Sequence, residues 1–190
     1  MGTILGDGYL QKTGQKNARL RLEHGEAQKE YVLWEGSQFP KLFLGKPVHL
    51  ERTHPKTNRV YKYWRWQSNS TPVLGKWHAV FYKNGTKCLP KNLSDLLNQS
   101  LALAVWYMDD GYFHCLNHNR YSMLYLGCVS AEEAKIAAEA ISRNFKIHPK
   151  VYDKKKKGYA LFFSVTETKK LHDMIRPYVL PLFNYKLYSL

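Results

Sequence analysis

A chain of 190 residues is long enough to bury a hydrophobic core, as one domain or as two small half-domains. Its 29 Lys and Arg against 15 Asp and Glu give a formal net charge of +14, which favours nucleic acid as partner over an acidic membrane or a merely soluble basic surface. No apolar run approaches the roughly 18 residues that a membrane span needs, and residues 1–10 lack the features of a signal peptide. The three cysteines have no paired spacing, which indicates a reduced intracellular compartment without distinguishing a mitochondrion or chloroplast from a bacterial or archaeal cytoplasm.

The first part of the chain alternates predicted β-hairpins with predicted helices. The segment 18–23 shows the clearest alternation, because its apolar residues recur at every second position with charged residues between them. In chain order we expect a hairpin at 9–12 and 18–23, a helix at 26–34, a hairpin at 48–53 and 60–68, and a helix at 71–82.

The second part repeats this order. Its central helix has a strong start signal, because Ser130 is followed three residues later by Glu133 in a capping box. We expect a hairpin at 111–115 and 121–127, a helix at 131–144, a hairpin at 146–153 and 159–165, a helix at 166–175, and an irregular or short helical tail at 176–190.

Two short blocks, residues 2–9 and 103–112, mark the duplication. Each carries an apolar run into one acidic residue that is followed by Gly and Tyr. Superposing Asp7 on Asp110 sets an offset of 103 residues, which places the segment 18–23 on 121–126. A repeat of this length predicts an α+β fold of two pseudo-symmetric αββαββα half-domains, residues 1–97 and 98–190.

The two blocks resemble the LAGLIDADG motif of homing endonucleases, and the chain is similar to the monomeric two-motif branch typified by the yeast mitochondrial omega-intron endonuclease. The second block fits from Leu103 to Gly111, and the resemblance extends through residues 87–93 and 177–187. In this family the first motif helix begins well before its glycine, so we expect either that the chain is trimmed at its N-terminus or that this helix is about two turns short. The resemblance implies motif helices at the interface between the half-domains and antiparallel sheets that form a DNA-binding saddle.

The resemblance assigns metal binding to the last acidic residues of the motifs, Asp7 and Asp110, helped by the carbonyls of Gly6 and Asp109. A carboxylate at a helix C-terminus is disfavoured, and two of them side by side repel each other unless a cation lies between them. Mg²⁺ is the expected cofactor, with Mn²⁺ able to substitute. Gly6, and similarly Ala104, would let the helices approach closely. The alternatives are ordinary helix-end turns and, for Asp109, a surface partner of Arg or Lys.

The resemblance also places two lysines, Lys87 and Lys186, near the scissile phosphates. Their expected catalytic role is to polarise the phosphate or to orient the attacking water. The alternative is a generic phosphate contact.

DNA contact is expected from the alternate, polar face of each predicted strand, and bidentate Arg contacts to guanine would be the strongest base-specific interactions. Trp64 and Trp66 then belong to the helix-packed face. The expected DNA-binding residues are Arg19, Arg21, Glu23, Tyr61, Tyr63, Arg65, Gln67, His148, Lys150 and Tyr152.

The function expected is a site-specific, Mg²⁺-dependent endonuclease that makes a staggered double-strand break in a long DNA target. The alternative is an RNA maturase, with intron RNA as partner, or a non-cleaving DNA-binding protein of the same fold. Retention of both Asp7 and Asp110 favours the enzyme, because a pure binder has no need of paired acids.

Overall fold

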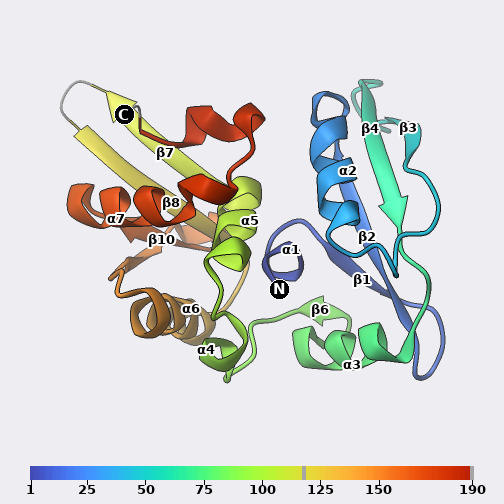
Figure 1. The fold of residues 1–190 in the computed structure, drawn as a ribbon, viewed down its shortest axis with the longest axis horizontal. Coiled ribbons are helices and arrows are strands. Elements are labelled where there is room, and N and C mark those ends of the chain that lie inside the picture. Colours follow the sequence, from blue (N-terminus) through green and yellow to red (C-terminus); the bar gives the residue numbers. More distant parts are fainter. Residues whose placement is uncertain (117–118, 189–190) are drawn as a thin grey trace. The chain divides into compact units, whose positions relative to one another are not determined.

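The computed structural model describes residues 1–116 and 119–188, and the chain divides into two compact units (Figure 1). The continuous unit is residues 7–82, and the discontinuous unit combines residues 1–6 with the chain from Lys83 onward. The expected division between residues 97 and 98 concerns the sequence repeat and stays a prediction. No helix among the described residues has both the length and the apolar character needed to cross a membrane.

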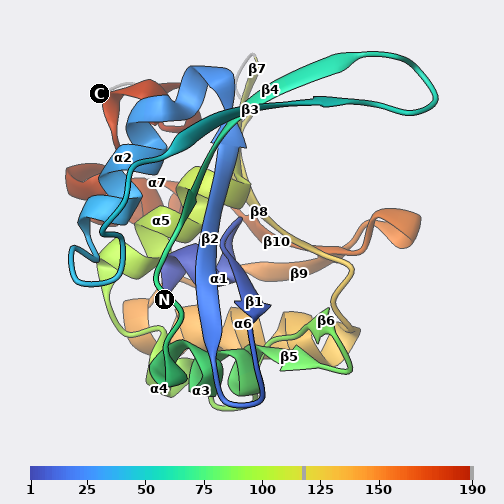
Figure 2. The same cartoon turned by 90° about the vertical axis from the view of Figure 1, so that its right-hand side faces the viewer.

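The continuous unit is a four-stranded antiparallel sheet with helices packed on it. Helix α2 packs against β2 and β4, and α3 packs against β1 and β2. The β3–β4 hairpin reaches well beyond the rest of this sheet (Figure 2). The strand order is β1-β2-β4-β3, with the elements β1 Tyr9–Lys12, β2 Ala18–Gly25, η1 Glu26–Gln28, α2 Lys29–Ser37, β3 Val48–Thr53, β4 Val60–Gln67 and α3 Pro72–Phe81.

The discontinuous unit contains a second sheet with the corresponding order, β7-β8-β10-β9. Two antiparallel sheets of the same topology confirm the mixed α and β fold with a duplicated pattern. Its elements are α1 Gly2–Leu5, β6 Thr86–Lys87, α4 Leu93–Leu96, α5 Ser100–Asp110, β7 Gly111–Leu116, β8 Asn119–Gly127, α6 Ala131–Phe145, β9 Lys150–Asp153, η2 Lys155–Lys157, β10 Tyr159–Phe163, α7 Val165–Ile175, η3 Arg176–Tyr178 and η4 Pro181–Lys186. Strand β5, Tyr82–Lys83, pairs with β6 in a small third sheet.

The predicted order of hairpins and helices is confirmed, and the capping box of Ser130 and Glu133 is present at the start of α6. Strand β9 is the main correction, because it begins at Lys150 and not at residue 146. Lys146 adopts the left-handed conformation, φ 57°, that ends α6, so the chain needs several residues to turn into the strand. The pair β5–β6 and helix α4 carry no strong sequence signal and were not expected.

Strand pairing corrects the offset between the two sheets by one residue. Tyr9 in β1 lies opposite Arg21, whereas Tyr112 in β7 lies opposite Met123. Relative to these partners β8 therefore follows β2 by 102 residues and not by 103. Since successive side chains of a strand point to opposite faces, a slip of one residue exchanges the two faces. The corrected offset places Leu22 on Leu124, and both are fully buried.

Candidate functional site

The two motif helices pack side by side within the discontinuous unit because α1 presents glycines to α5 (Figure 1). A Cβ on Gly2 would lie 2.1 Å from the carbonyl oxygen of Ala102 and 2.7 Å from Cβ of Val105. A Cβ on Gly6 would clash with the carboxylate of Asp109. Gly2 and Gly6 are one helical turn apart, so both face the same partner. The close approach predicted for Gly6 is confirmed, and Gly2 shares it. The α5 residues opposite these glycines are Ala102, Val105 and Asp109, whereas Ala104 is fully buried elsewhere on α5.

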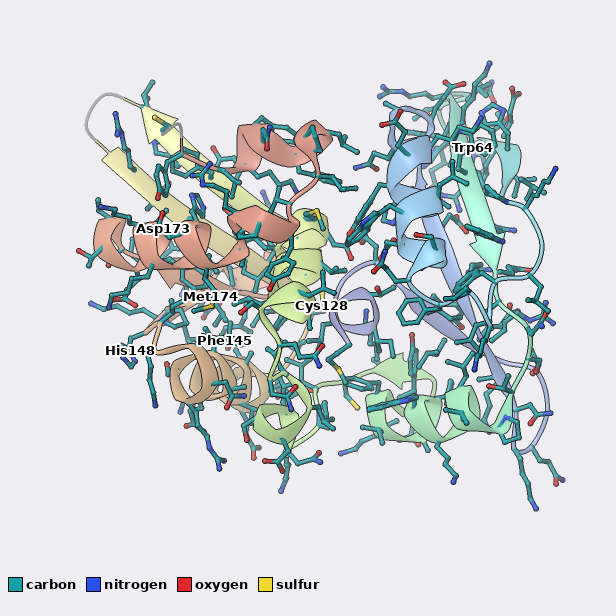
Figure 3. All side chains as sticks on the ribbon, in the orientation of Figure 1. Trp64, Cys128, Phe145, His148, Asp173 and Met174 are labelled. Carbon is teal, nitrogen blue, oxygen red and sulfur yellow. The ribbon has the colours of Figure 1, made fainter. Side chains whose placement is uncertain are left out.

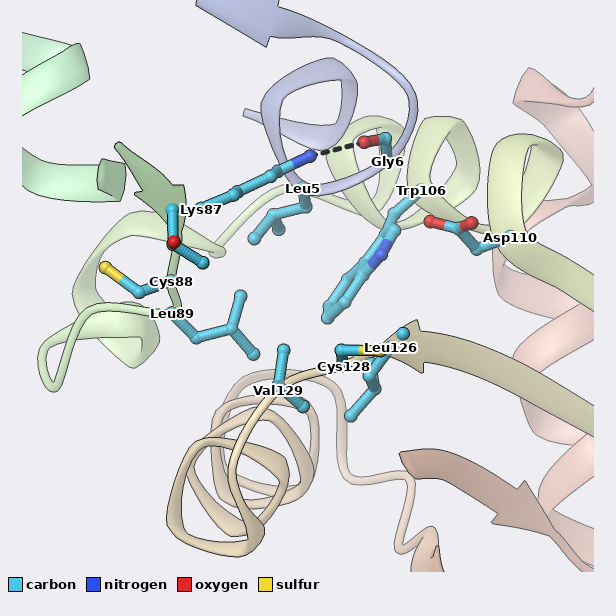
Figure 4. A pocket seen from close by; sticks show the side chains of 12 residues that line it. Leu5, Gly6, Lys87, Cys88, Leu89, Trp106, Asp110, Leu126, Cys128 and Val129 are labelled. Atoms are coloured by element: carbon cyan, nitrogen blue, oxygen red, sulfur yellow. Dashed lines mark hydrogen bonds between the residues drawn. The ribbon is translucent and has the colours of Figure 1, made fainter. Parts of the chain in front are cut away.

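Lys87 contacts the end of α1 and lines a cavity that is also lined by the second motif acid, Asp110. Its Nζ donates a hydrogen bond to the carbonyl oxygen of Gly6 at 2.5 Å. The Gly6 carbonyl, Lys87 and Asp110 line one cavity of about 330 Å³, with Trp106 beside Asp110 (Figure 4). A carbonyl at the end of α1, an ammonium on β6 and a carboxylate at the end of α5 thus line the same cavity.

Lys186 holds the end of α5 in the same manner. Its Nζ donates to the carbonyl oxygen of Met108 at 2.6 Å and to that of Asp109 at 3.1 Å. These carbonyls belong to the last turn of α5, where carbonyl groups have no backbone N–H donor within the helix and a nearby cation is stabilising. Each lysine therefore contacts the carbonyl that directly precedes a motif acid, Gly6 before Asp7 and Asp109 before Asp110.

A buried polar cluster anchors the segment that carries Lys186. The hydroxyl of Tyr107 lies 3.0 Å from both Ser122 Oγ and His172 Nε2, and donates to the carbonyl oxygen of Lys186 at 3.0 Å. His172 Nδ1 accepts from the backbone N–H of Tyr188 at 3.0 Å. Burial lowers the pKa of His172 to about 3 and raises the pKa of Tyr107. The neutral ring and the phenol thus tie α5, β8 and α7 to the C-terminal segment.

The first motif acid, Asp7, has a different neighbourhood in the continuous unit. Its Oδ2 lies 3.8 Å from Nδ1 of His24, and Nε2 of His24 lies 2.7 Å from Oε2 of Glu35. The side chains of His24 and Glu35 are 3% and 1% exposed, whereas that of Asp7 is 53% exposed. A buried charged group needs such a partner, because its desolvation is otherwise costly.

On the continuous unit's sheet, the residues expected to bind DNA share the face opposite the helices. Arg65 Nε donates to Glu23 at 2.8 Å and its Nη2 donates to the Tyr63 hydroxyl at 3.3 Å, while Arg19 donates to the Gln67 amide oxygen at 3.3 Å. Tyr9, which was not predicted, joins them with its ring beneath the guanidinium of Arg21, 4.9 Å from its centroid. Tyr61 and Arg52 are paired on β4 and β3 and continue this face.

Trp64 and Trp66 lie on the helix-packed face, as predicted. The ammonium of Lys29 lies over the ring of Trp64, 4.4 Å from its centroid, and Trp66 packs against Phe43 with ring centroids 5.2 Å apart. Figure 3 labels Trp64 beside β4. A Cβ on Gly36 of α2 would collide with the Trp66 ring. Both rings therefore fill space between sheet and helices.

On the second sheet, two of the three expected DNA-binding residues lie on a strand and the third does not. Lys150 pairs with Phe162 and Tyr152 with Ala160. His148 lies in the connection between α6 and β9, where its backbone N–H donates to Glu167 at 2.6 Å (Figure 3). The sequence analysis placed His148 in a strand because it predicted that this strand begins at residue 146, whereas β9 begins at Lys150.

The sequence analysis also missed aromatic residues on the face of the second sheet that carries Lys150 and Tyr152. Tyr112, His114, Tyr121 and Tyr125 line this face, with the ammonium of Lys154 over the ring of Tyr125 at 3.9 Å. Alternation within 111–127 could have found them. The sequence analysis assigned no open face to the strands of this hairpin.

The model of the LAGLIDADG DNA endonuclease family matches residues 1–171. The chain belongs to this family. The match contains both motif acids and Lys87, and it ends before Lys186. The sequence resemblance to LAGLIDADG proteins is therefore confirmed.

Two relatives illustrate the range of proteins that carry similar sequence. A probable intron-encoded endonuclease 1 of Wickerhamomyces canadensis is 24% identical over 98% of this chain and 81% of its own length. A protein RecA of Mycolicibacterium flavescens is 28% identical over 98% of this chain but only 45% of its own length. The chain thus spans about half the length of the RecA relatives it matches.

Solved structures show the same fold. The homing endonuclease I-WcaI, bound to its DNA recognition sequence, superposes with a TM-score of 0.88 at 23% identity, over 100% of this chain and 84% of that one. Forms of I-DmoI bound to DNA in the presence of Mn or Mg superpose with TM-scores of 0.52, at 14% and 13% identity and over 95% and 92% of this chain. They cover 93% and 92% of the I-DmoI chains.

His24 and Glu35 are site candidates that the sequence analysis did not identify. The signal was present in the alternation of β2, where His24 occupies the fourth buried position after Ala18, Leu20 and Leu22. A polar residue at a core position of a strand must have a polar partner. That partner, Glu35 on α2, is visible only in three dimensions.

Proposed function

We propose that the chain is a site-specific homing endonuclease that makes a staggered double-strand break in a long DNA target by metal-dependent phosphodiester hydrolysis. The observation that carries the proposal is the matched pair of lysines. Lys87 holds the carbonyl before Asp7, and Lys186 holds the carbonyl before Asp110. An ordinary helix end needs no such duplicated arrangement, whereas two hydrolytic centres, one for each DNA strand, do.

The donor atoms fit a hard divalent cation. The Gly6 carbonyl and the Asp110 carboxylate line one cavity, and both are oxygen ligands of the kind that Mg²⁺ and Mn²⁺ accept. The carbonyl has two lone pairs, so the hydrogen bond from Lys87 leaves it able to bind a cation. We assign Asp7 and Asp110 as metal ligands, with the carbonyls of Gly6 and Asp109 as helpers. A bound cation would supply Lewis acidity and a lowered pKa for attacking water.

We also assign the two lysines a role in contacting the substrate, in addition to their hydrogen bonds with the helix-end carbonyls. An ammonium held at the end of a motif helix is fixed in position, since its side chain is ordered by the carbonyl contacts. It would stabilise the charge that develops on the phosphate, and pre-organisation makes such a contact more effective than a mobile surface charge. Lys87 and Lys186 are thus proposed catalytic residues in addition to helix-capping ones.

The open sheet faces are the proposed DNA-binding surfaces. Guanidinium groups on the first sheet are held by Glu23 and Gln67, which leaves their remaining N–H groups to reach base edges and phosphates. The proposed contacts are Arg19, Arg21, Glu23, Tyr61, Tyr63, Arg65, Gln67, Lys150 and Tyr152. His148 is also proposed to contact DNA, from the loop between α6 and β9.

The test is cleavage of a target selected from a randomised duplex library, with the Asp7→Asn and Asp110→Asn variants. Each should abolish double-strand cleavage and retain duplex affinity, because the substitution removes a metal ligand and little of the DNA surface. Asp95→Asn is the matched control, since Asp95 is an exposed carboxylate on α4.

Two outcomes contradict the proposal. Metal-dependent cleavage at the wild-type rate by both motif variants would remove Asp7 and Asp110 from the site. Tight duplex binding by the wild-type protein with no cleaved sequence in the library, in Mg²⁺ or Mn²⁺, would favour a non-cleaving DNA-binding protein.

A further inference from the structure

The two motif acids differ in the side chain that the neighbouring strand presents to them. Asp7 faces Nδ1 of His24 at 3.8 Å, and His24 is held from its other side by the buried carboxylate of Glu35 at 2.7 Å. We propose that His24 is a nitrogen ligand of a transition-metal site at Asp7, with Glu35 as the residue that orients the imidazole.

The Glu35 contact fixes which ring nitrogen can bind a metal. A carboxylate accepts hydrogen bonds, so Nε2 of His24 is the donor in the 2.7 Å contact. A neutral ring that donates through Nε2 directs the lone pair of Nδ1 toward Asp7. Metal-binding histidines in proteins characteristically donate their second ring nitrogen to a carboxylate in this way. With His24 and Glu35 both buried, the ring orientation is fixed before any ion arrives.

The separation of the two ligand atoms suits one shared ion. Metal ligands of this type lie about 2.1 Å from the ion, so two of them on one ion lie roughly 3–4 Å apart. The 3.8 Å between Asp7 Oδ2 and His24 Nδ1 falls in this range and exceeds an ordinary hydrogen bond. The half-exposed carboxylate of Asp7 leaves a path for the ion to enter.

The donor set predicts metal selectivity. Imidazole nitrogen favours Co²⁺, Ni²⁺ or Zn²⁺, whereas Mg²⁺ prefers oxygen ligands. A site built from His24 and Asp7 therefore takes a transition metal more tightly than Mg²⁺. This inference rests on the proposed metal role of Asp7 and is independent of cleavage.

The second motif has no counterpart of this imidazole. By the offset of 102 residues that strand pairing defines, the position of His24 corresponds to Leu126. Leu126 lines the cavity that contains Asp110, so the neighbouring strand offers a hydrocarbon side chain there. We therefore expect one tight transition-metal site per chain, at Asp7, and oxygen-only binding at Asp110.

The test is a titration of the metal-free protein with Co²⁺ in the absence of DNA, followed by visible absorption and calorimetry. We expect one tightly bound Co²⁺ per chain, at least tenfold weaker binding in His24→Gln, and about 10–100-fold weaker binding in Glu35→Gln, which keeps the hydrogen bond but lowers the ligand's basicity. His49→Gln is the matched control, because His49 also pairs with a carboxylate, Glu26 at 3.3 Å, on the same sheet. Binding of Mg²⁺ should be the same in all four proteins.

Wild-type Co²⁺ affinity in a folded His24→Gln variant would overturn the proposal. If that variant does not fold, NMR of the imidazole nitrogens in the wild-type protein decides. Addition of Zn²⁺ should shift Nδ1 of His24, and an unchanged resonance would overturn the assignment. Cleavage in Mg²⁺ without a Co²⁺ site would refute this inference alone. A Co²⁺ site in a protein that never cleaves would refute only the proposed function.

Discussion

Replacing Gly2 by alanine probes the contact between the two motif helices. The new Cβ would lie 2.1 Å from the backbone oxygen of Ala102, and ordinary contact begins near 3.4 Å. A backbone carbonyl has no rotamer by which to move aside, so α1 must shift by about 1.3 Å, the difference between those two distances. Because the clash is with backbone, the overpacking cost lies at the upper end of its range, about 2–3 kcal/mol, and the better helix propensity of alanine returns about 1 kcal/mol. The expected net destabilisation is roughly 1–2 kcal/mol.

Differential scanning calorimetry measures this cost directly. At about 2–4 °C per kcal/mol for a chain of this size, Gly2→Ala should lower the unfolding temperature by roughly 2–8 °C. Gly14→Ala is the matched control, because a Cβ there has nothing within 4 Å. Its reduced freedom in the unfolded chain predicts no change or a small rise in unfolding temperature.

The same shift of α1 should reach the chemistry, because the helix carries the Gly6 carbonyl and leads into Asp7. A displacement of about 1 Å at a catalytic group can slow a reaction about 100-fold. We therefore expect slower cleavage with little change in DNA affinity. An unfolding temperature at or above that of the wild type, together with full activity, would refute the tight packing of α1 on α5.

Three further predictions concern charge and protonation. Burial lowers the pKa of His172 to about 3, so between pH 6.5 and 3 the unfolded chain binds more protons than the folded protein. The free energy of unfolding should therefore decrease as the pH is lowered from 6.5 to 3. The slope should reach about 1.4 kcal/mol per pH unit and be lost in His172→Asn, and equal slopes in urea unfolding of both proteins would contradict it. Lys186→Met should slow cleavage mainly at one DNA strand, so that nicked duplex accumulates. Lys146→Met should not, although Lys146 also donates to a helix-end carbonyl, at 3.2 Å, and equal slowing of both strands by Lys186→Met would leave it a phosphate contact only. Duplex affinity should fall with salt with a log–log slope of roughly −5 to −9, as six to ten phosphate contacts require, and a flat dependence would exclude the proposed sheet surfaces.

The sequence was sufficient to predict elements whose signals are local. The alternation of Arg19, Arg21 and Glu23 gave the correct open face of β2, and Ser130 with Glu133 gave the start of α6. The long-range contacts of side chains could not be predicted in this way. Nothing near Lys87 or Lys186 in sequence indicates that their ammonium groups end on the carbonyls beside the motif acids, because those contacts span about 80 residues.

The errors have an equally physical origin. Counting residues from Asp110 assumed that both hairpins have the same length, but the second is one residue shorter between paired positions. Strand period is two, so an offset of 103 residues aligns the open face of β2 with the buried face of β8 and not with Tyr121 and Tyr125. The pairing of His24 with Glu35 was missed because it joins a strand to a helix, and periodicity within one element carries no information about its partner.

The path of the chain through the discontinuous unit has a consequence for biogenesis. Residues 1–6 leave the ribosome well before their packing partner α5, which begins only at Ser100. Bringing α1 and α5 together closes a loop of that length, which costs roughly 4 kcal/mol of chain entropy. The contacts that offset this cost form only after α5 has been synthesised. The intervening residues 7–82 form their own sheet and can fold in the meantime. A nascent chain can therefore form the sheet that carries the proposed DNA contacts before α1 packs on α5, and a polypeptide interrupted before α5 would lack the packed pair of motif helices.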